Sequence, residues 1–428
     1  MAAENVFDEL KRRGFSAQTT DPEPLYELLG REHVTFYIGF DPTADSLHVG
    51  HLMGVMAMAI MQKYGHRPIA IVGGGTAMVG DPSGKTEMRK MLTREQIVAN
   101  TAKIKEQLSR YLDFGKGKAI LIDNYEWLGS LNYIEFLRDI GRHFSVNKML
   151  TYETYKRRME TGLSFLEFNY QLLQSYDFYM LHKKYNCRLQ MGGDDQWANI
   201  LAGADLIRRI EGADVYGHTF PLITTATGQK MGKTEAGAVW LDAEKTTPYD
   251  YYQYWINVDD RDVIKFLSFF TLLPMDEIES IKNLEGTQFN TAKTVLAYEA
   301  TKMTHGEQAA QQAMQASLAA FGARQVQEDF LPSSSIPRGA VAANTATIPS
   351  IDLEKTVLEK NTKVAEVLGD YKLTKSRGEA RRLIQQGGVY INGERVMDVD
   401  AALDLDDAIE GRIAVRLGKK KHFHLMIR

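Results

Sequence analysis

Two histidines, His48 and His51, stand three residues apart where an alternating, strand-like pattern over 34–38 gives way to a helical pattern over 52–60. A helix N-terminus carries unpaired amide donors and partial positive charge, and Gly50 lets a ligand approach the backbone closely. Imidazole donors at such a terminus are suited to binding a phosphate. Taken alone, the pair also fits two helix-capping or buried histidines.

A second cationic cluster, Lys230-Met231-Gly232-Lys233-Thr234, follows the polar, glycine-containing stretch 227–229. That composition predicts a loop. Two lysines around a glycine are usually a solvated surface turn, so the cluster takes on a chemical meaning only together with the two histidines.

A third set of polar residues lies on one stripe of a predicted helix over 164–184. Tyr170, Gln174 and Asp177 are offset by four and seven residues, which places them within about 60° of arc. A tyrosine and a glutamine that satisfy each other would explain two of them without any ligand. Asp177 is flanked by aromatic residues, and a carboxylate in apolar surroundings needs a partner.

Two glycine-rich stretches resemble nucleotide-binding loops but lack the required spacing. The stretch 80–86 has three residues between its glycines where a P-loop has four, and Pro82 removes an amide donor. The run Gly73-Gly74-Gly75 lacks the third glycine of a dinucleotide fingerprint, which argues against a dehydrogenase.

The elements that position these residues alternate between strands and helices. Helical patterns over 51–64, 94–112 and 164–184 separate strand-like segments at 34–38, 68–72, 119–122 and 188–191. Strands separated by helices predict parallel βαβ units and a sheet covered on both faces. Ligands of such sheets bind beyond the carboxyl ends of the strands, where Gly39, Gly73 and Gly192 follow or end strands.

The rest of the chain predicts two further domains. The sequence over 249–330 is rich in helix-forming residues, 331–355 has the composition of a linker, and a basic unit begins near residue 356. The predicted fold class is therefore α/β: a Rossmann-like parallel-sheet domain over 1–248, a helical domain over 249–330, and a small, basic α+β domain over 356–428.

Composition narrows the class of protein. A length of 428 residues suggests about three domains, and the single cysteine, Cys187, excludes an intrachain disulfide framework and argues against a structural zinc site. No apolar run is long enough for a membrane helix, so we expect a cytoplasmic protein. Net charge is −4 overall, but residues 356–428 hold 14 Lys and Arg against 11 Asp and Glu. Basicity is concentrated at the C-terminal end.

The C-terminal unit has the pattern of a nucleic-acid binder. A basic helix over 376–384 is followed by a short strand and an Asn-Gly turn at Asn392. This resembles the α-L RNA-binding motif of a ribosomal small-subunit protein. Without that resemblance, its arginines would be an ordinary solvated face. The basic residues that the resemblance assigns to RNA are Lys375, Arg377, Arg381, Arg382, Lys419, Lys420 and Lys421.

The histidine pair and the lysine cluster together resemble the HIGH and KMSKS signatures of class I aminoacyl-tRNA synthetases. The surrounding residues resemble the bacterial tyrosyl-tRNA synthetases in particular, and the similarity extends over almost the whole chain. It implies activation of L-tyrosine with ATP and Mg²⁺, transfer of the tyrosyl group to the terminal ribose of its tRNA, and a homodimer. No resident metal site is implied.

The resemblance also implies a role for each matching residue. Tyr37 and Asp177 would bind the phenolic hydroxyl, Gln196 would lie near the substrate carboxylate, and the α-ammonium group would be held by Asp81, Tyr170 and Gln174. Residues implied at the ATP and its ribose are Gly39, Asp41, Gly50, Gly193, Asp195 and Lys233. Residues implied around the reacting phosphates are Thr43, His48, His51, Lys85, Arg89, Lys230, Lys233 and Thr234.

Two positions depart from the family pattern. Ile38 stands where many members have cysteine, and Gly54 lacks a side chain often found near the same sugar, so we expect weaker or rearranged ribose contacts. Two alternatives remain at this point. One is the related tryptophan-specific synthetase, against which Tyr37 and Asp177 favour a phenol. The other is a non-catalytic RNA-binding homologue, which would have lost the phosphate-binding residues.

Overall fold

The structure is a computed structural model that describes residues 5–81, 83, 92–228, 231, 233–234, 237–321, 326–338, 348–409, 411–418 and 421–428, with backbone alone for Lys233 and Thr234. The chain forms two compact units. Unit 1 comprises residues 1–246 and 259–284, and unit 2 comprises residues 247–258 and 285–428.

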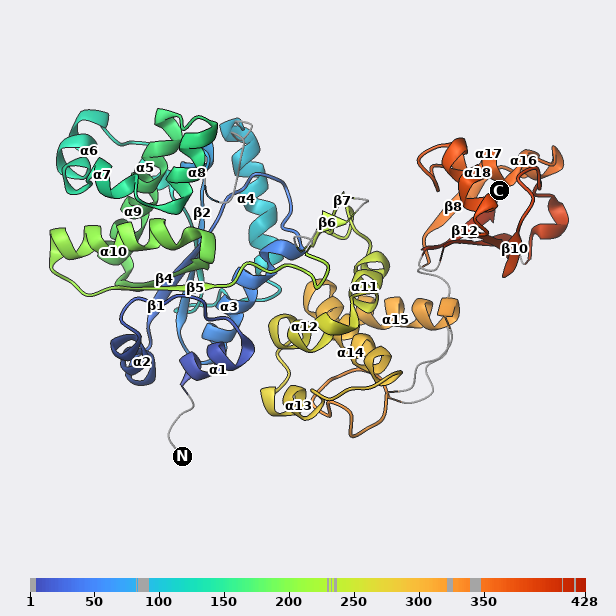
Figure 1. Cartoon of the computed structure of the whole chain (residues 1–428), viewed down its shortest axis with the longest axis horizontal. Coiled ribbons are helices and arrows are strands. Elements are labelled where there is room, and N and C mark those ends of the chain that lie inside the picture. Colours follow the sequence, from blue (N-terminus) through green and yellow to red (C-terminus); the bar gives the residue numbers. More distant parts are fainter. Residues whose placement is uncertain are drawn as a thin grey trace. The chain divides into compact units, whose positions relative to one another are not determined.

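Unit 1 is built on a five-stranded parallel sheet with the order β3-β2-β1-β4-β5. The central strand β1 pairs with β2 on one side and with β4 on the other, so the strand order reverses between β1 and β4. Figure 1 shows α9 and α10 on one side of this sheet and α3 on the other. The strands are β1 (Thr35–Phe40), β2 (Arg67–Val72), β3 (Ile120–Asp123), β4 (Cys187–Gly193) and β5 (Tyr216–Phe220).

The helices of unit 1 follow the strands in βαβ order. The short 3-10 helix η1 (Val49–His51) opens directly into α3, whose residues from Leu52 to Met61 are all buried. The helices of this unit are α1 (Val6–Arg13), α2 (Pro22–Arg31), α3 (Leu52–Lys63), α4 (Arg94–Leu108), α5 (Tyr125–Leu128), α6 (Tyr133–Asp139), α7 (Val146–Met149), α8 (Glu153–Thr161), α9 (Phe165–Tyr185), α10 (Trp197–Glu211), α12 (Val263–Phe270) and α13 (Met275–Ser280).

The predicted parallel sheet is confirmed, and α4 ends four residues earlier than the pattern suggests. The sequence did not predict β5. Its residues His218 and Thr219 are polar yet buried, because the His218 ring contacts Thr19 Oγ1 at 2.9 Å and the Phe15 carbonyl at 2.8 Å. Hydrogen bonds to the N-terminal segment thus replace the apolar pattern by which a buried strand is usually recognised.

Helices α12 and α13 fold with unit 1, although the predicted division places them in the helical domain. Arg13 of α1 donates hydrogen bonds to the carbonyls of Ser268, Thr271 and Leu273 at 2.6–3.0 Å. Phe15 also packs edge to face on Phe269, with ring centroids 5.3 Å apart. The domain boundaries stay predictions.

The first part of unit 2 is helical, with α11 (Pro248–Ile256), α14 (Gln288–His305) and α15 (Glu307–Phe321). Helices α14 and α15 follow each other directly in the sequence. Gly306 separates them with a φ of 88°, a left-handed conformation that favours glycine.

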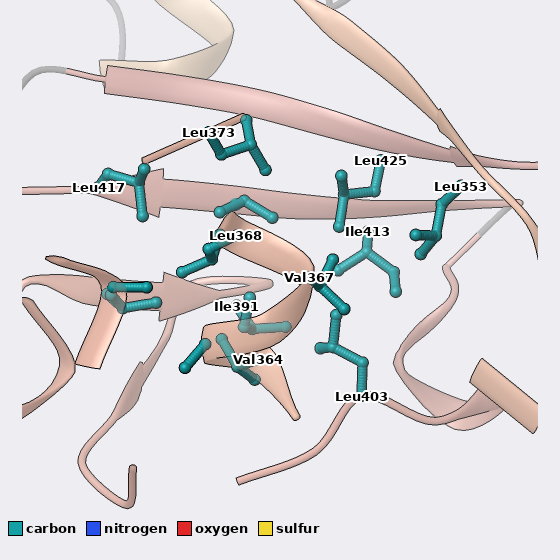
Figure 2. Close-up of a cluster of buried hydrophobic side chains, with 14 of the residues drawn as sticks. Leu353, Val364, Val367, Leu368, Leu373, Ile391, Leu403, Ile413, Leu417 and Leu425 are labelled. Carbon is teal, nitrogen blue, oxygen red and sulfur yellow. The ribbon is translucent and has the colours of Figure 1, made fainter. Parts of the chain in front are cut away.

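The second part of unit 2 is a mixed sheet of order β10-β9-β11-β12-β8. Its strands are β8 (Ser350–Leu353), β9 (Val389–Ile391), β10 (Glu394–Val396), β11 (Arg412–Leu417) and β12 (Lys421–Ile427), and its helices are α16 (Lys355–Glu359), α17 (Val364–Asp370) and α18 (Arg377–Gln385). Figure 2 shows the core, in which Val367 and Leu368 of α17 lie among Ile413 and Leu425 of the strands. The α/β fold with a small α+β domain is confirmed.

Candidate active site

A pocket of about 400 Å³ opens beyond the carboxyl ends of β1 and β4. Tyr37 and Gly39 reach it from β1, and Gln190 and Gly193 reach it from β4. These two neighbouring strands are the ones between which the strand order reverses. This is the position at which doubly wound parallel sheets bind ligands, since the connecting helices diverge to opposite faces there.

Asp177 of α9 lies at the buried end of this pocket with 3% of its surface exposed. Asn124 Nδ2 donates to one of its carboxylate oxygens at 2.9 Å, and Trp127 Nε1 donates to the other at 2.7 Å. Burial raises the pKa of Asp177 to about 7, although both hydrogen bonds oppose that shift. Each oxygen keeps acceptor capacity for a further donor in the pocket.

The hydroxyl of Tyr37 is a buried polar group that has no hydrogen-bond partner among the residues that the structure describes. Its ring is held on β1 against Phe178, with centroids 5.3 Å apart. Burial raises the pKa of Tyr37, with the nearby Asp177 carboxyl adding to the effect. A buried hydroxyl without a partner costs stability, so Tyr37 is suited to a ligand that brings a hydrogen-bonding group.

A chain of amides and a carboxylate forms a second polar side of the pocket. Gln196 Nε2 donates to Asp81 Oδ2 at 2.8 Å, and Gln174 Nε2 donates to Gln196 Oε1 at 3.1 Å. Asn199 Nδ2 donates to the Gln174 side-chain oxygen at 3.0 Å. These contacts fix both glutamines and leave a carboxylate and amide oxygens lining the pocket, a combination that suits an ammonium group.

The two histidines cap the helix that begins beside the pocket. His48 Nδ1 accepts the Gly50 amide at 3.0 Å, and His51 Nδ1 accepts the His48 amide at 3.1 Å. In a neutral imidazole whose Nδ1 accepts, the proton is on Nε2, so each ring is a donor at that atom. Gly50 is required here, because a Cβ on it would lie 2.7 Å from the His48 ring.

Two more glycines make room for carboxylates that line the pocket. A Cβ on Gly73 would lie 2.6 Å from Asp41 Oδ1, and a Cβ on Gly193 would lie 2.7 Å from Asp195 Oδ1. The glycine-rich strand ends that the sequence suggested therefore have a steric function, which is to let acidic side chains fold over the backbone.

Comparison with known proteins decides the family. A family model described as tRNA synthetases class I (W and Y) matches residues 30–322, and a model of the tyrosine–tRNA ligase SYY-like C-terminal domain matches residues 340–425. The tyrosine–tRNA ligase of Desulfosudis oleivorans is 53% identical over 429 residues, covering 99% of each chain. The chain belongs to the class I tyrosine–tRNA ligases. The ligase of Syntrophus aciditrophicus is also 53% identical, over 100% of both chains.

A solved structure agrees with this assignment. The C-terminally truncated mitochondrial tyrosyl-tRNA synthetase of Aspergillus nidulans superposes with a TM-score of 0.67 at 30% identity, over 74% of this chain and 94% of that one. The tyrosine–tRNA ligase family therefore takes precedence over both alternatives raised by the sequence, the tryptophan-specific enzyme and the non-catalytic RNA binder.

The structure brings most of the residues proposed for a tyrosine–tRNA ligase site into the one pocket. His48 is not among the lining residues: its ring stacks near His51, with centroids 4.0 Å apart, and packs on Trp240. Lys85, Arg89 and Lys230 fall outside the described residues, as do the side chains of Lys233 and Thr234 in β6 (Lys233–Thr234). The proposed residues that line the pocket are Tyr37, Gly39, Asp41, Thr43, Gly50, His51, Asp81, Tyr170, Gln174, Asp177, Gly193, Asp195 and Gln196.

The proposed RNA-binding residues of the C-terminal domain have different surroundings. Lys375, Arg381 and Arg382 are exposed, whereas Arg377 forms a two-point ion pair with Asp370 at 2.5 and 2.7 Å. Lys421 begins β12, which lies between β11 and β8 in the sheet. Lys419 and Lys420 are outside the described residues. The RNA contacts of all these residues stay predictions.

Sequence reasoning missed several residues that shape the site. Asn124 and Trp127 hold Asp177, Asn199 holds Gln174, and Gln190 lines the pocket with its amide oxygen buried and without a partner. Asn124 could have been found, because it directly follows β3 at the carboxyl end of the sheet. The sequence does not mark Trp127 as a site residue, since a tryptophan in a short helix is typical of core packing.

The two departures from the family pattern lie side by side. Ile38 and Gly54 both line the pocket, and a Cβ on Gly54 would lie 3.4 Å from Ile38 Cγ2. The Ile38 side chain on β1 thus lies beside the space that a side chain at position 54 on α3 would enter. The expected change in ribose contacts stays a prediction, and nucleotide affinity measured for Ile38→Cys tests it.

Proposed function

We propose that the pocket between β1 and β4 activates L-tyrosine with ATP, and that the tyrosyl group then passes to the terminal ribose of its tRNA. The observation that carries this assignment is the buried pair of Tyr37, whose hydroxyl has no partner, and Asp177, whose oxygens are oriented by two donors. A phenolic hydroxyl donates to Asp177 and pairs with Tyr37, which satisfies both groups.

The other end of the amino acid is held by the amide chain. The α-ammonium group binds Asp81, Tyr170 and Gln174, and the amide of Gln196 lies near the carboxylate. Because Gln196 already bonds both Asp81 and Gln174, its orientation is fixed before the substrate arrives. Such preorganisation lowers the entropic cost of placing the carboxylate in line with the α-phosphate of ATP.

Attack on the α-phosphate needs no general base, since the substrate carboxylate is ionised. The oxygen–phosphorus bond forms as the bond to the pyrophosphate oxygen breaks, and negative charge spreads over the phosphate oxygens. His48, His51 and Thr43 stabilise that charge by hydrogen bonds, and Lys85, Arg89, Lys230, Lys233 and Thr234 complete the cationic surroundings. Asp41, Asp195 and the backbone at Gly39, Gly50 and Gly193 bind the nucleoside.

Magnesium enters as the complex with ATP in this proposal. Among the residues that the structure describes, no three His, Cys, Asp or Glu side chains gather in a way that could hold a metal ion. Phosphate oxygens and water are the ligands that Mg²⁺ prefers in such sites, and bound Mg²⁺ would neutralise charge on the departing pyrophosphate.

We expect tyrosine recognition to depend on pH through Asp177. Its pKa of about 7 lies above the ordinary value of 3.8, so the carboxylate form that accepts the phenol is lost as pH falls below 7. kcat/KM for tyrosine in ATP–pyrophosphate exchange should drop roughly tenfold from pH 8 to pH 6. Phenylalanine, which has no hydroxyl, provides the control: its profile should be flatter, and identical profiles would contradict the assignment.

The raised pKa of Asp177 also affects the stability of the fold, and in the opposite direction: activity should rise with pH, whereas stability should fall. Because the folded-state pKa is raised, the folded protein holds the proton of Asp177 more tightly than the unfolded chain does. This carboxyl therefore lowers the free energy of unfolding as pH rises from about 4 to 7, the window between the two pKa values.

We further propose that the protein is a homodimer in the cytoplasm. Helices α6 to α9 share one core that includes Phe136, Met149 and Tyr155, yet their other faces expose large apolar side chains. These are Tyr133, Ile134, Leu137, Val146, Met159, Phe165 and Leu166, with exposed fractions between 37% and 71%. An apolar patch of this kind is typical of a protein–protein interface. Among the described residues, no helix is long and apolar enough to cross a membrane.

Ile134→Arg is expected to shift the protein from dimer to monomer, because it places a charge in the buried interface. Sedimentation velocity measures the change directly. Met397→Arg is the matched control, since Met397 is 62% exposed against 71% for Ile134 but lies in the C-terminal sheet domain. A dimer that persists in Ile134→Arg would place the interface elsewhere.

The first test of the proposed activity is exchange of pyrophosphate into ATP without tRNA, run with tyrosine, phenylalanine and tryptophan. Exchange with tyrosine alone, followed by charging of tRNA, is the expected result. Exchange driven by tryptophan, or by no amino acid, would reject the proposed substrate.

A further inference from the structure

The C-terminal sheet has two chemically different faces. The inner face carries Val389, Ile413, Val415 and Leu425, which pack in one core with α17 and α18. Side chains alternate along a strand, so the residues between them point to the opposite side. We define the outer sheet face by these residues: Tyr390 of β9, Arg412, Ala414 and Arg416 of β11, and His422, His424 and Met426 of β12.

A row of stacking and cationic groups crosses this face. Arg416 pairs directly with Tyr390 on β9 and with His422 on β12. Its guanidinium carbon lies 3.6 Å from the centroid of the Tyr390 ring. A cavity of about 450 Å³ lies between this row and the end of α15. Its lining includes Arg412, Arg416 and His422 of the sheet and Ala319 and Ala320 of the helix.

The charge on this face is positive. Arg412 and Arg416 both belong to it, and Asp352 on the edge strand β8 accepts a hydrogen bond from Arg428 at 3.0 Å. Burial, with Arg416 and His424 nearby, lowers the pKa of His422 to about 4. At neutral pH the charge therefore comes from arginines, while the neutral His422 imidazole packs edge to face against Phe321 of α15, with ring centroids 4.4 Å apart.

We propose that the outer sheet face is a second RNA-contacting surface, which binds an unpaired nucleotide of the tRNA. Its base stacks on the Arg416–Tyr390 pair, and its phosphate binds the arginines. Sheet faces that carry arginines and aromatic rings bind single-stranded RNA in this way, and here the cavity between the sheet and α15 provides the space for the base. The proposal rests on the proposed function, because it takes the tRNA as partner. It is separate from α18, since Ala380 and Ile384 of that helix pack against the inner face.

The test uses the full-length protein and two substitutions at one residue. Arg416→Glu should weaken binding of the tRNA about tenfold and lower the salt dependence of binding by about one phosphate contact. Arg416→Lys keeps the charge but not the planar stack, so it should retain phosphate attraction and lose the preference for a short single-stranded RNA over the matching duplex. This second variant keeps the test decisive if Arg416→Glu does not fold.

Two comparisons make the result specific. Lys360→Glu changes charge by the same amount on an exposed residue of the same domain and should alter tRNA binding less than threefold. Arg382→Glu on α18 should give a loss that combines additively with that of Arg416→Glu, because the two lie on different sides of the domain. Binding by Arg416→Glu within twofold of wild type, or an equal loss in Lys360→Glu, would overturn the proposal.

ATP–pyrophosphate exchange separates this inference from the proposed activity. Tyrosine activation does not involve tRNA, so exchange should be unchanged in every variant of the C-terminal domain. Unchanged exchange with unchanged tRNA binding rejects the outer sheet face alone, whereas absence of exchange in the wild-type protein rejects the proposed function.

Discussion

Asp177→Ala should lower kcat/KM for tyrosine in ATP–pyrophosphate exchange by about 100-fold or more. A hydrogen bond to a buried charged group contributes about 1.5–3 kcal/mol, and the substitution also leaves the Asn124 and Trp127 donors without their acceptor. Phenylalanine forms no such bond, so its kcat/KM should change much less. The ratio of the two rate constants is therefore the diagnostic quantity.

The control for this experiment is a buried polar residue on the same helix. Ser175 is fully buried and donates to the Gln171 carbonyl at 2.7 Å, but it does not line the pocket. Ser175→Ala should leave the ratio unchanged. If Asp177→Ala instead reduced the rates for tyrosine and phenylalanine equally, the carboxylate would be acting on the structure of the site and not on recognition of the phenol.

Arg13→Ala is expected to cost about 3–5 kcal/mol in the free energy of unfolding of unit 1. Arg13 is 3% exposed and pairs with Glu9 at 2.6 Å while bonding three carbonyls near the end of α12. Truncation leaves an unpaired carboxylate and unsatisfied carbonyls in a buried site, which is far costlier than loss of a surface pair.

The adjacent residue provides the matched control. Arg12 pairs with Asp276 and Glu279, but its side chain is 34% exposed and that of Asp276 is 87% exposed. Arg12→Ala should cost at most about 1 kcal/mol. Urea unfolding followed by far-UV circular dichroism measures both, and adding Glu9→Ala to Arg13→Ala should recover part of the loss. Equal losses in the free energy of unfolding for Arg13→Ala and Arg12→Ala would show that the buried network stabilises the fold no more than the exposed ion pairs do.

The sequence predicted those parts of the site that depend on residues close together in the chain, and it missed contacts between residues far apart in the chain. The stripe of Tyr170, Gln174 and Asp177 was found because helical periodicity is a local property, and all three line the pocket. The role of Trp127 depends on the docking of α5 against α9, fifty residues away along the chain. No local pattern encodes such a contact, so the Trp127 hydrogen bond, which opposes the rise in the pKa of Asp177, was accessible only in the folded structure.

The same distinction explains the fold. The strands that carry apolar residues were predicted, because they alternate in the sequence with helical patterns, as βαβ units do. Strand β5 was missed, because buried His218 and Thr219 are satisfied by Thr19, Phe15 and Gln18 of the N-terminal segment. Helices α12 and α13 were placed in another domain for a related reason, since Arg13, which joins α1 to α12, reads in the sequence as an ordinary surface arginine.

The pairing of β1 with β4 has a consequence for how the protein comes into being. Tyr37 faces Gln190 across that pair, about 150 residues later in the chain, and the binding pocket lies where these two strands meet. A chain emerging from the ribosome therefore cannot form the tyrosine-binding pocket until β4 has been synthesised and has joined the sheet. Affinity for tyrosine should appear late and abruptly during synthesis, as a property of the completed sheet.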